Sequence, residues 1–279
     1  MSRAPVFVGG MFKSGTTLLR AMLSQHSAIA SGLETYWFSW NWEQRQGPQF
    51  QEALDRLSTF FDLDREALIA LAQAAPTSED FLDRMMRMVA ERDGKPRWAE
   101  KTPGNVAHVD RIWAHWQDAQ VVHIIRDPRD IFASLVEARK WDTAEDFASR
   151  WCDIVGQGER LRVRLQPSSD RYLAIRYEEL IGSPENTMRT VVSFLGETWE
   201  PAAAKFEGRA EDFQKVRDAT GKESTTLARL RQPLGGERVG IWERVLSESQ
   251  VEDIRAAVAS RGFGDLYEQI TRGAAPAGF

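Results

Sequence analysis

Residues 10–17 have the residue types and the glycine spacing of a loop that binds a nucleotide phosphate. They read Gly-Met-Phe-Lys-Ser-Gly-Thr-Thr, but Thr16 stands where an ATP-binding loop has its lysine, and Lys13 comes three positions earlier. Backbone N–H groups between the glycines can still surround an anion, and a helix that begins at Thr16 would direct its positive end toward that anion. We expect a bound nucleotide without the magnesium-assisted chemistry of an ATPase, and the expected contacts are Lys13, Ser14, Gly15, Thr16 and Thr17.

A second anion site is indicated directly after the apolar run 121–125. This run leads into Arg126, and Ser134 follows eight positions later in the next predicted helix. A guanidinium at a strand end and a hydroxyl early in the next helix suit a second phosphate. Ion pairing of Arg126 with Asp127 or Asp130 is the competing interpretation.

Together, residues 7–23 and 122–134 resemble the sulfotransferases that use 3′-phosphoadenosine 5′-phosphosulfate (PAPS). The first segment resembles the family's 5′-phosphosulfate loop, and the second resembles its 3′-phosphate motif. The resemblance implies transfer of a sulfonate to a hydroxyl or amine of a small-molecule or peptide acceptor. It also implies adenosine 3′,5′-bisphosphate (PAP) as the product and no required metal. Other matching blocks follow in the family's order at 98–103, 177–180, 194–196 and 239–242.

Residues 32–36, Gly-Leu-Glu-Thr-Tyr, look closest to the tyrosylprotein sulfotransferase branch, in which a glutamate at this position is the catalytic base. The resemblance assigns that role to Glu34, whose pKa we expect the neighbouring aromatic residues to raise. His26 is the alternative base, since other branches use histidine.

Basic and aromatic residues complete the expected site. Lys13 and Lys101 would neutralise the oxygen that leaves with the nucleotide, from opposite sides. A surface ion pair with Glu100 is the alternative role of Lys101. Tyr177 would contact the adenine. Arg238 would replace the basic run that precedes the family's Gly-x-Trp element, a motif that this sequence matches only in part.

Two other classes of function stay open. In a divergent phosphate-loop kinase, Thr16 would bind magnesium and Lys13 the terminal phosphate, but Arg126 stands where a magnesium-binding aspartate should follow the strand. A non-catalytic nucleotide-binding module would use the loop as an anchor and would leave Glu34 and Lys101 without a role.

An α/β fold is needed to bring these segments together. Apolar runs alternate with helical spacing of apolar residues, and this alternation predicts a parallel sheet with helices on both faces and with ligands at the carboxyl ends of the strands. We expect one phosphate-loop-type domain over residues 1–272, a helical insertion at about 43–95 in which Ser78 caps a helix, and a disordered tail at 273–279. Strands are expected at 5–9, 97–101, 121–125 and 172–176, and helices from 16, at 63–75, 78–91 and 105–116, from 128, and at 143–165, 184–195 and 248–262.

Composition limits the partners and the location. A net charge of −5 from 36 basic and 41 acidic residues gives no basic surface for nucleic acid. Cys152 is the single cysteine, so no internal disulfide forms, and residues 1–10 lack the pattern of a signal peptide. No apolar stretch reaches the roughly 18 residues that span a bilayer. We expect a cytoplasmic protein without membrane attachment, unlike the anchored luminal enzymes of the tyrosylprotein branch.

Overall fold

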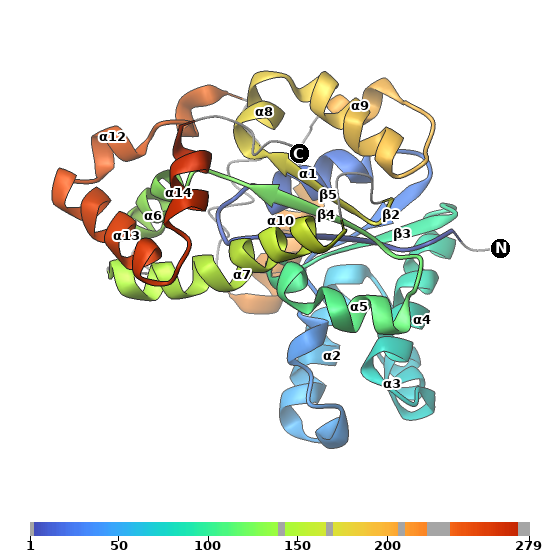
Figure 1. Ribbon diagram of the computed structural model, residues 1–279. Coiled ribbons are helices and arrows are strands. Elements are labelled where there is room, and N and C mark those ends of the chain that lie inside the picture. The colour runs from blue at the N-terminus through green and yellow to red at the C-terminus, as the bar shows by residue number, and fades with distance from the viewer. Residues whose placement is uncertain (1–2, 139–142, 166–169, 206–209, 222–234, 273–279) are drawn as a thin grey trace.

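A parallel sheet forms the centre of the molecule. The computed structural model describes residues 3–138, 143–165, 170–205, 210–221 and 235–272. Its strands lie in the order β2-β3-β1-β4-β5 (Figure 1) and comprise β1 (Val6–Gly10), β2 (Ile29–Ser31), β3 (Arg97–Lys101), β4 (Gln120–Ile125) and β5 (Tyr172–Arg176). The strand order reverses at β1, and open parallel sheets bind ligands at the carboxyl ends of the strands beside such a reversal.

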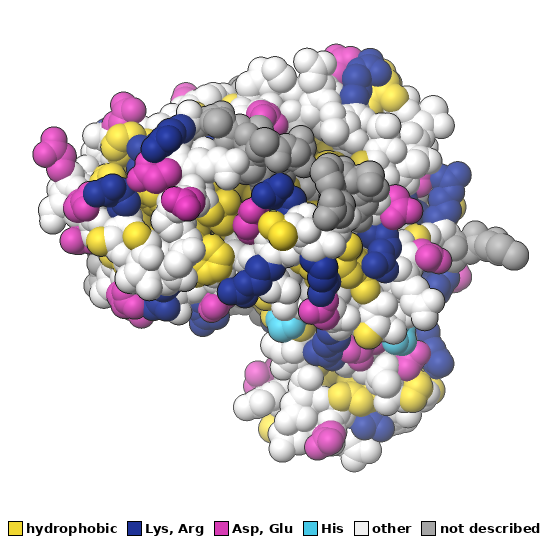
Figure 2. Space-filling model, in the orientation of Figure 1, with side chains coloured by type: hydrophobic (Ala, Val, Ile, Leu, Met, Phe, Trp, Pro, Cys, Tyr) yellow, Lys and Arg dark blue, Asp and Glu magenta, His cyan; other side chains and the backbone are white. Residues whose placement is uncertain are grey.

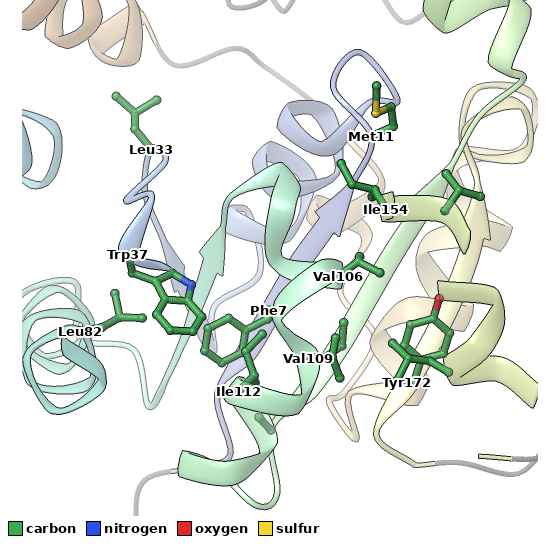
Figure 3. Packing of buried hydrophobic residues seen from close by; sticks show 14 of the residues in the cluster. Phe7, Met11, Leu33, Trp37, Leu82, Val106, Val109, Ile112, Ile154 and Tyr172 are labelled. Carbon is green, nitrogen blue, oxygen red and sulfur yellow. The ribbon is translucent and has the colours of Figure 1, made fainter. Parts of the chain in front are cut away.

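The strands are buried on both faces, which explains their nearly continuous apolar sequences. Successive side chains alternate between the faces. Val8 packs in one apolar cluster with Ile124 of the neighbouring strand, whereas Phe7 belongs to the cluster on the opposite face. Figure 3 shows Phe7 next to Trp37, and their ring centroids are 6.2 Å apart. Two apolar layers therefore hold the sheet in place and fix which edge carries the functional loops.

Helices cover both faces of the sheet (Figure 1). One face packs against α1 (Thr16–Ser24), α8 (Tyr177–Gly182) and α9 (Pro184–Phe194). The opposite face packs against α4 (Ser78–Arg92), α5 (Val109–His115) and α7 (Ala144–Leu165), and the same cluster continues into α6 (Pro128–Glu137), α13 (Glu248–Ser260) and α14 (Gly264–Thr271). Other described elements are α10 (Ala210–Thr220), α12 (Trp242–Val245) and short 3₁₀ turns at η1 (Trp37–Ser39), η2 (Trp42–Gln44), η3 (Pro103–His108), η4 (Pro201–Ala204) and η5 (Gly236–Arg238).

Between β2 and β3 the chain forms α2 (Pro48–Phe61), α3 (Arg65–Ala74) and α4, and Figure 1 shows α2 and α3 extending from the body of the molecule. The aromatic residues before α2 attach this extension. Trp40 and Trp42 lie 5.9 and 5.6 Å from the Phe50 ring, and both also contact Phe81 of α4. Burial of these large rings stabilises the junction beside residues 34–36.

Most predicted elements are present, but α8, α10, α12 and α14 were not predicted, and three further differences follow. The strand β2 was not predicted, because three residues are too short to show a periodic pattern. Thr77, and not Ser78, caps α4: its Oγ1 accepts a hydrogen bond from the Asp80 N–H at 3.1 Å. The helix expected from 105 begins as the 3₁₀ turn η3. The tail at 273–279 lies outside the described residues.

Basic and acidic side chains are interspersed over the face seen in Figure 2, on the body and on the helical extension alike. Cys152 is buried, as expected for a small packing residue, and burial raises the pKa of its thiol to about 11. Among the described helices, none combines the length and the apolar character needed to cross a membrane.

Candidate functional site

The loop between β1 and α1 presents backbone N–H groups at the carboxyl edge of the sheet. Gly15 has φ 103°, and a Cβ at this position would lie 2.5 Å from Cδ2 of Tyr177, so only glycine fits. No side chain caps α1, which leaves the N–H groups of its first turn for an anion. The hydroxyl of Ser14 is completely buried and has no hydrogen-bond partner among the described residues. The loop thus has the geometry of an anion site.

Lys101, the last residue of β3, connects this loop to Glu34. Its Nζ donates to the Glu34 carboxylate and lies 3.3 Å from Oγ1 of Thr17 in α1. The Lys101 side chain is only 2% exposed and that of Glu34 24%. The alternative of a surface ion pair with Glu100 is wrong, because Glu100 is buried on the other side of the strand and accepts hydrogen bonds from Thr35 instead.

The pKa of Glu34 lies below its ordinary value of 4.5. Burial raises this pKa, but the Lys101 ammonium and the hydrogen bonds from Lys101 and Tyr36 together outweigh burial. The expectation that aromatic neighbours raise it was therefore wrong. Burial lowers the pKa of Lys101, against the attraction of Glu34. Glu34 is ionised at neutral pH and has the charge state that a proton acceptor requires.

Arg20 is a third cation at this end of the site, and the sequence analysis missed it. It lies in α1, completely buried, and its Nη2 donates to Asp212 of α10 at 2.8 Å. Its Nε and Nη1 have no partner among the described residues, and its charge contributes to lowering the pKa of both Glu34 and Lys101. The sequence did contain a signal for Arg20, because it is an arginine within an apolar helix. It comes four positions after Thr16 and therefore lies on the same helix face as Thr16.

His26, the alternative base, lies away from these contacts. Its Nε2 is 2.7 Å from the carbonyl oxygen of Thr198, and its Nδ1 accepts from the N–H of Ala28 at 3.0 Å. The side chain is buried. Both ring nitrogens of His26 are therefore engaged by main-chain groups.

Arg126, Ser134 and Arg238 come together on the other side of the loop. Arg126 follows β4, and its Nη1 donates to the carbonyl oxygen of Lys13 at 2.8 Å, while Nη2 donates to that of Arg238. Arg238 in turn donates to Oγ of Ser134 at 3.0 Å. The guanidinium of Arg126 also lies 4.4 Å from the centre of the Tyr177 ring. Within the described chain, the Nε atoms of both arginines are buried without a partner.

The two nearby aspartates have different partners. Asp127 caps α6 by accepting from the N–H of Arg129, and it also pairs with the Arg129 guanidinium at 2.6 Å. Asp130 lies 3.7 Å from Arg126, and its oxygens also accept from the N–H groups of Gly240 and Trp242 at 2.9 and 3.2 Å. Arg126 thus forms a buried ion pair with Asp130, as the competing interpretation expects, whereas Asp127 pairs with Arg129.

Basic side chains thus lie on two sides of one phosphate-type loop: Lys101, paired with Glu34, on one side, and Arg126 and Arg238 on the other. Such an arrangement suits a ligand with two separated anionic groups, next to a carboxylate that can take a proton. A profile of the sulfotransferase family matches residues 5–201. The chain belongs to the sulfotransferase family.

Sequence relatives within this family include animal enzymes. The chain is 25% identical over 223 residues to a protein-tyrosine sulfotransferase of Drosophila melanogaster, covering 72% of the chain and 40% of that protein. It is 27% identical to protein-tyrosine sulfotransferase A of Caenorhabditis elegans, covering 70% of the chain and 50% of that protein. The chain therefore spans about half the length of the curated relatives it matches.

Solved sulfotransferase structures share the fold. The sulfotransferase domain of the Synechococcus PCC 7002 olefin synthase superposes with a TM-score of 0.64 at 19% identity, over 93% of this chain and 96% of that domain. A mouse sulfotransferase complexed with PAP superposes with a TM-score of 0.56 at 15% identity, over 97% of this chain and 89% of the mouse chain. The predicted α/β class with a central parallel sheet is confirmed.

Proposed function

We propose that this protein transfers a sulfonate from PAPS to a hydroxyl or amine of a small-molecule or peptide acceptor, without a metal. The observation that supports this most directly is the set of basic side chains on two sides of the loop between β1 and α1. PAPS carries a phosphosulfate and a separate 3′-phosphate, so it requires two separate anion sites. Membership of the sulfotransferase family supports the same donor.

The chemistry of the residues fits this donor. Buried polar atoms normally have hydrogen-bond partners, yet Oγ of Ser14 and the Nε atoms of Arg126 and Arg238 lack one among the described residues. The Ser14 hydroxyl, the first turn of α1 and Lys13 would hold the 5′-phosphosulfate. Arg126, Ser134 and Arg238 would hold the 3′-phosphate, and the Tyr177 ring would lie beside the adenosine.

When bound, PAPS supplies the sulfonate and a phosphate as its leaving group. Glu34 would accept the proton of the attacking hydroxyl, because its carboxylate is ionised and partly accessible. Lys101 would hold Glu34 in place and, with Lys13, neutralise the charge that develops on the leaving oxygen. Thr17 would orient Lys101 through the contact at 3.3 Å. Lys101 would thus have two roles: it positions the base, Glu34, and it stabilises the leaving group.

The kinase alternative has less support. A kinase would need a carboxylate for magnesium near the end of β4. The first carboxylate after β4 is that of Asp127, which caps α6 and pairs with Arg129. A cytoplasmic location and a single domain over residues 1–272 complete the proposal.

A comparison of PAP with ATP and magnesium in a thermal-shift assay tests the proposed function. A ligand that binds only the native state, at a free concentration 100 times its Kd, raises the free energy of unfolding by about 2.7 kcal/mol. We expect a large shift with PAP and a small one with ATP and magnesium, and we expect the release of PAP from PAPS to survive EDTA. A preference for ATP that depends on magnesium would favour the kinase instead.

A further inference from the structure

Tyr36 places a hydroxyl on the proposed catalytic base. Its phenol donates to Oε2 of Glu34, while Lys101 donates to Oε1. Both carboxylate oxygens are therefore engaged, one by a cation and one by a hydroxyl. A hydrogen bond of this type, from a hydroxyl to a Glu34 oxygen, is also what an acceptor needs in order to pass its proton to Glu34.

The main chain holds the phenol in this position. Tyr36 has φ 55° and ψ 33°, a left-handed conformation that a bulky residue rarely adopts. Its N–H donates to Oγ1 of Thr102 at 3.2 Å, and the preceding residue, Thr35, donates through both N–H and Oγ1 to buried Glu100. Unusual backbone conformations persist where surrounding contacts enforce them, commonly at functional sites.

Arg56 of α2 supports the phenol from the other side. Its guanidinium lies 5.3 Å from the centre of the Tyr36 ring, and its Nη2 donates to the carbonyl oxygen of Thr35 at 3.1 Å. Figure 3 shows Leu33 and Trp37, the residues directly before and after residues 34–36. The half-buried phenol thus has Glu34 at its hydroxyl and Arg56 of α2 beside its ring.

Successive contacts lead from the phenol to the phosphate loop. Tyr36 contacts Glu34, Glu34 contacts Lys101, and Lys101 lies 3.3 Å from Thr17 at the start of α1. The phenol is therefore linked to the phosphate loop through Glu34 and Lys101. Burial and the Glu34 charge raise the pKa of Tyr36, so the phenol keeps its proton until a base removes it during the reaction.

We propose that the Tyr36 hydroxyl occupies the acceptor position, and that with PAPS bound and no acceptor present Tyr36 itself becomes sulfonated. This inference rests on the proposed function. A bond forms between the phenolic oxygen and sulfur as the bond from sulfur to the 5′-phosphate oxygen breaks. The phenolic proton passes to Glu34, and PAP leaves with the bridging oxygen, so the products are an O-sulfonated Tyr36 and PAP.

Mass spectrometry of the whole protein incubated with PAPS alone tests this step. We expect the mass to rise by one SO3 group per chain, and tyrosine-peptide mapping to place it on Tyr36. Tyr172, Tyr177 and Tyr267 serve as internal controls, because all three are buried and no hydrogen bond to Glu34 is found for any of them among the described residues. Modification at one of these, or none at Tyr36 in protein that binds the donor, would overturn the inference.

Two variants complete the test. Tyr36→Phe should lose the modification, and Glu34→Gln should slow it by roughly 10²-fold or more, the usual contribution of a positioned base. Unchanged sulfonation of Tyr36 in Glu34→Gln would refute the transfer through Glu34. A PAP thermal shift on the same samples shows that each variant is folded. The same assay distinguishes failure of the proposed function from failure of the Tyr36 inference. Absence of PAP binding by the wild type would refute the proposed function. PAP binding without modification would refute only the role of Tyr36.

Discussion

Removing Glu34 alone should destabilise the protein more than removing both members of the Lys101–Glu34 pair. Glu34→Gln leaves the Lys101 ammonium, whose side chain is 2% exposed, without its counter-ion. Breaking a fully buried pair costs about 3–5 kcal/mol, and because Glu34 is 24% exposed we expect about 2–3 kcal/mol here. Lys101→Met leaves a carboxylate that water can reach, so about 1–2 kcal/mol is expected. The double variant carries neither charge and should lose about 1–2 kcal/mol.

Urea unfolding of the wild type, both single variants and the double variant measures the coupling free energy. We expect about 2 kcal/mol, within the range for residues in contact. The exposed pair Arg189–Glu185, with side chains 50% and 61% exposed, is a matched control that should couple by only about 0.3–0.5 kcal/mol. Additive effects at Lys101 and Glu34, within about 0.5 kcal/mol, would refute the pairing.

The same measurements should depend on pH in a defined direction. The folded-state pKa of Glu34 lies below 4.5, so its contribution to the free energy of unfolding is fully present above the unfolded-state value and is lost as the pH falls through the folded-state value. The stability difference between wild type and Glu34→Gln should therefore shrink in acid. A difference that stays constant from neutral pH through that acidic range would contradict an ionised Glu34.

Three further predictions address the rest of the site. Glu34→Gln should keep its PAP affinity within a few-fold but lower single-turnover transfer by roughly 10²- to 10⁴-fold. Arg126→Ala should weaken PAP binding by about 1.5–3 kcal/mol and adenosine 5′-monophosphate binding by less, as measured by calorimetry; equal losses would mean that Arg126 acts only by holding the loop. Gly15→Ala should cost about 1–3 kcal/mol in the free energy of unfolding because of its φ of 103° and the Tyr177 ring, whereas Gly182→Ala, which has nothing within 4 Å, should stay within about 0.5 kcal/mol.

Local patterns were enough to predict most of the framework. The apolar run before Arg126, followed by an aspartate and a proline, indicated the end of β4 and the start of α6, and both are present. The helix predicted at 248–262 is present as α13, and it begins at a capping box in which Ser247 and Gln250 form both hydrogen bonds. Such signals lie within a few residues of one another, so one segment of sequence contains them completely.

The electrostatics of the site could not be predicted in this way. The pKa of Glu34 depends on Lys101, which is 67 positions away, and the partner of Arg20 is 192 positions away. Only the packing of β2 beside β3, and of α10 near α1, brings these charges together. The sequence shows the residue types, but the sign of a pKa shift depends on distances that only the fold sets.

The contact between Asp212 and Arg20 also bears on which part of the chain can be regarded as a separable unit. All five strands lie within residues 5–201, the stretch that the family profile matches, yet completion of the site depends on later residues. A protein truncated after residue 201 would retain the sheet, but buried Arg20 would lose its carboxylate partner and Asp130 would lose the N–H groups of Gly240 and Trp242. Excising the matched stretch for expression, or grafting it onto another chain, would thus transfer the scaffold without a finished ligand pocket.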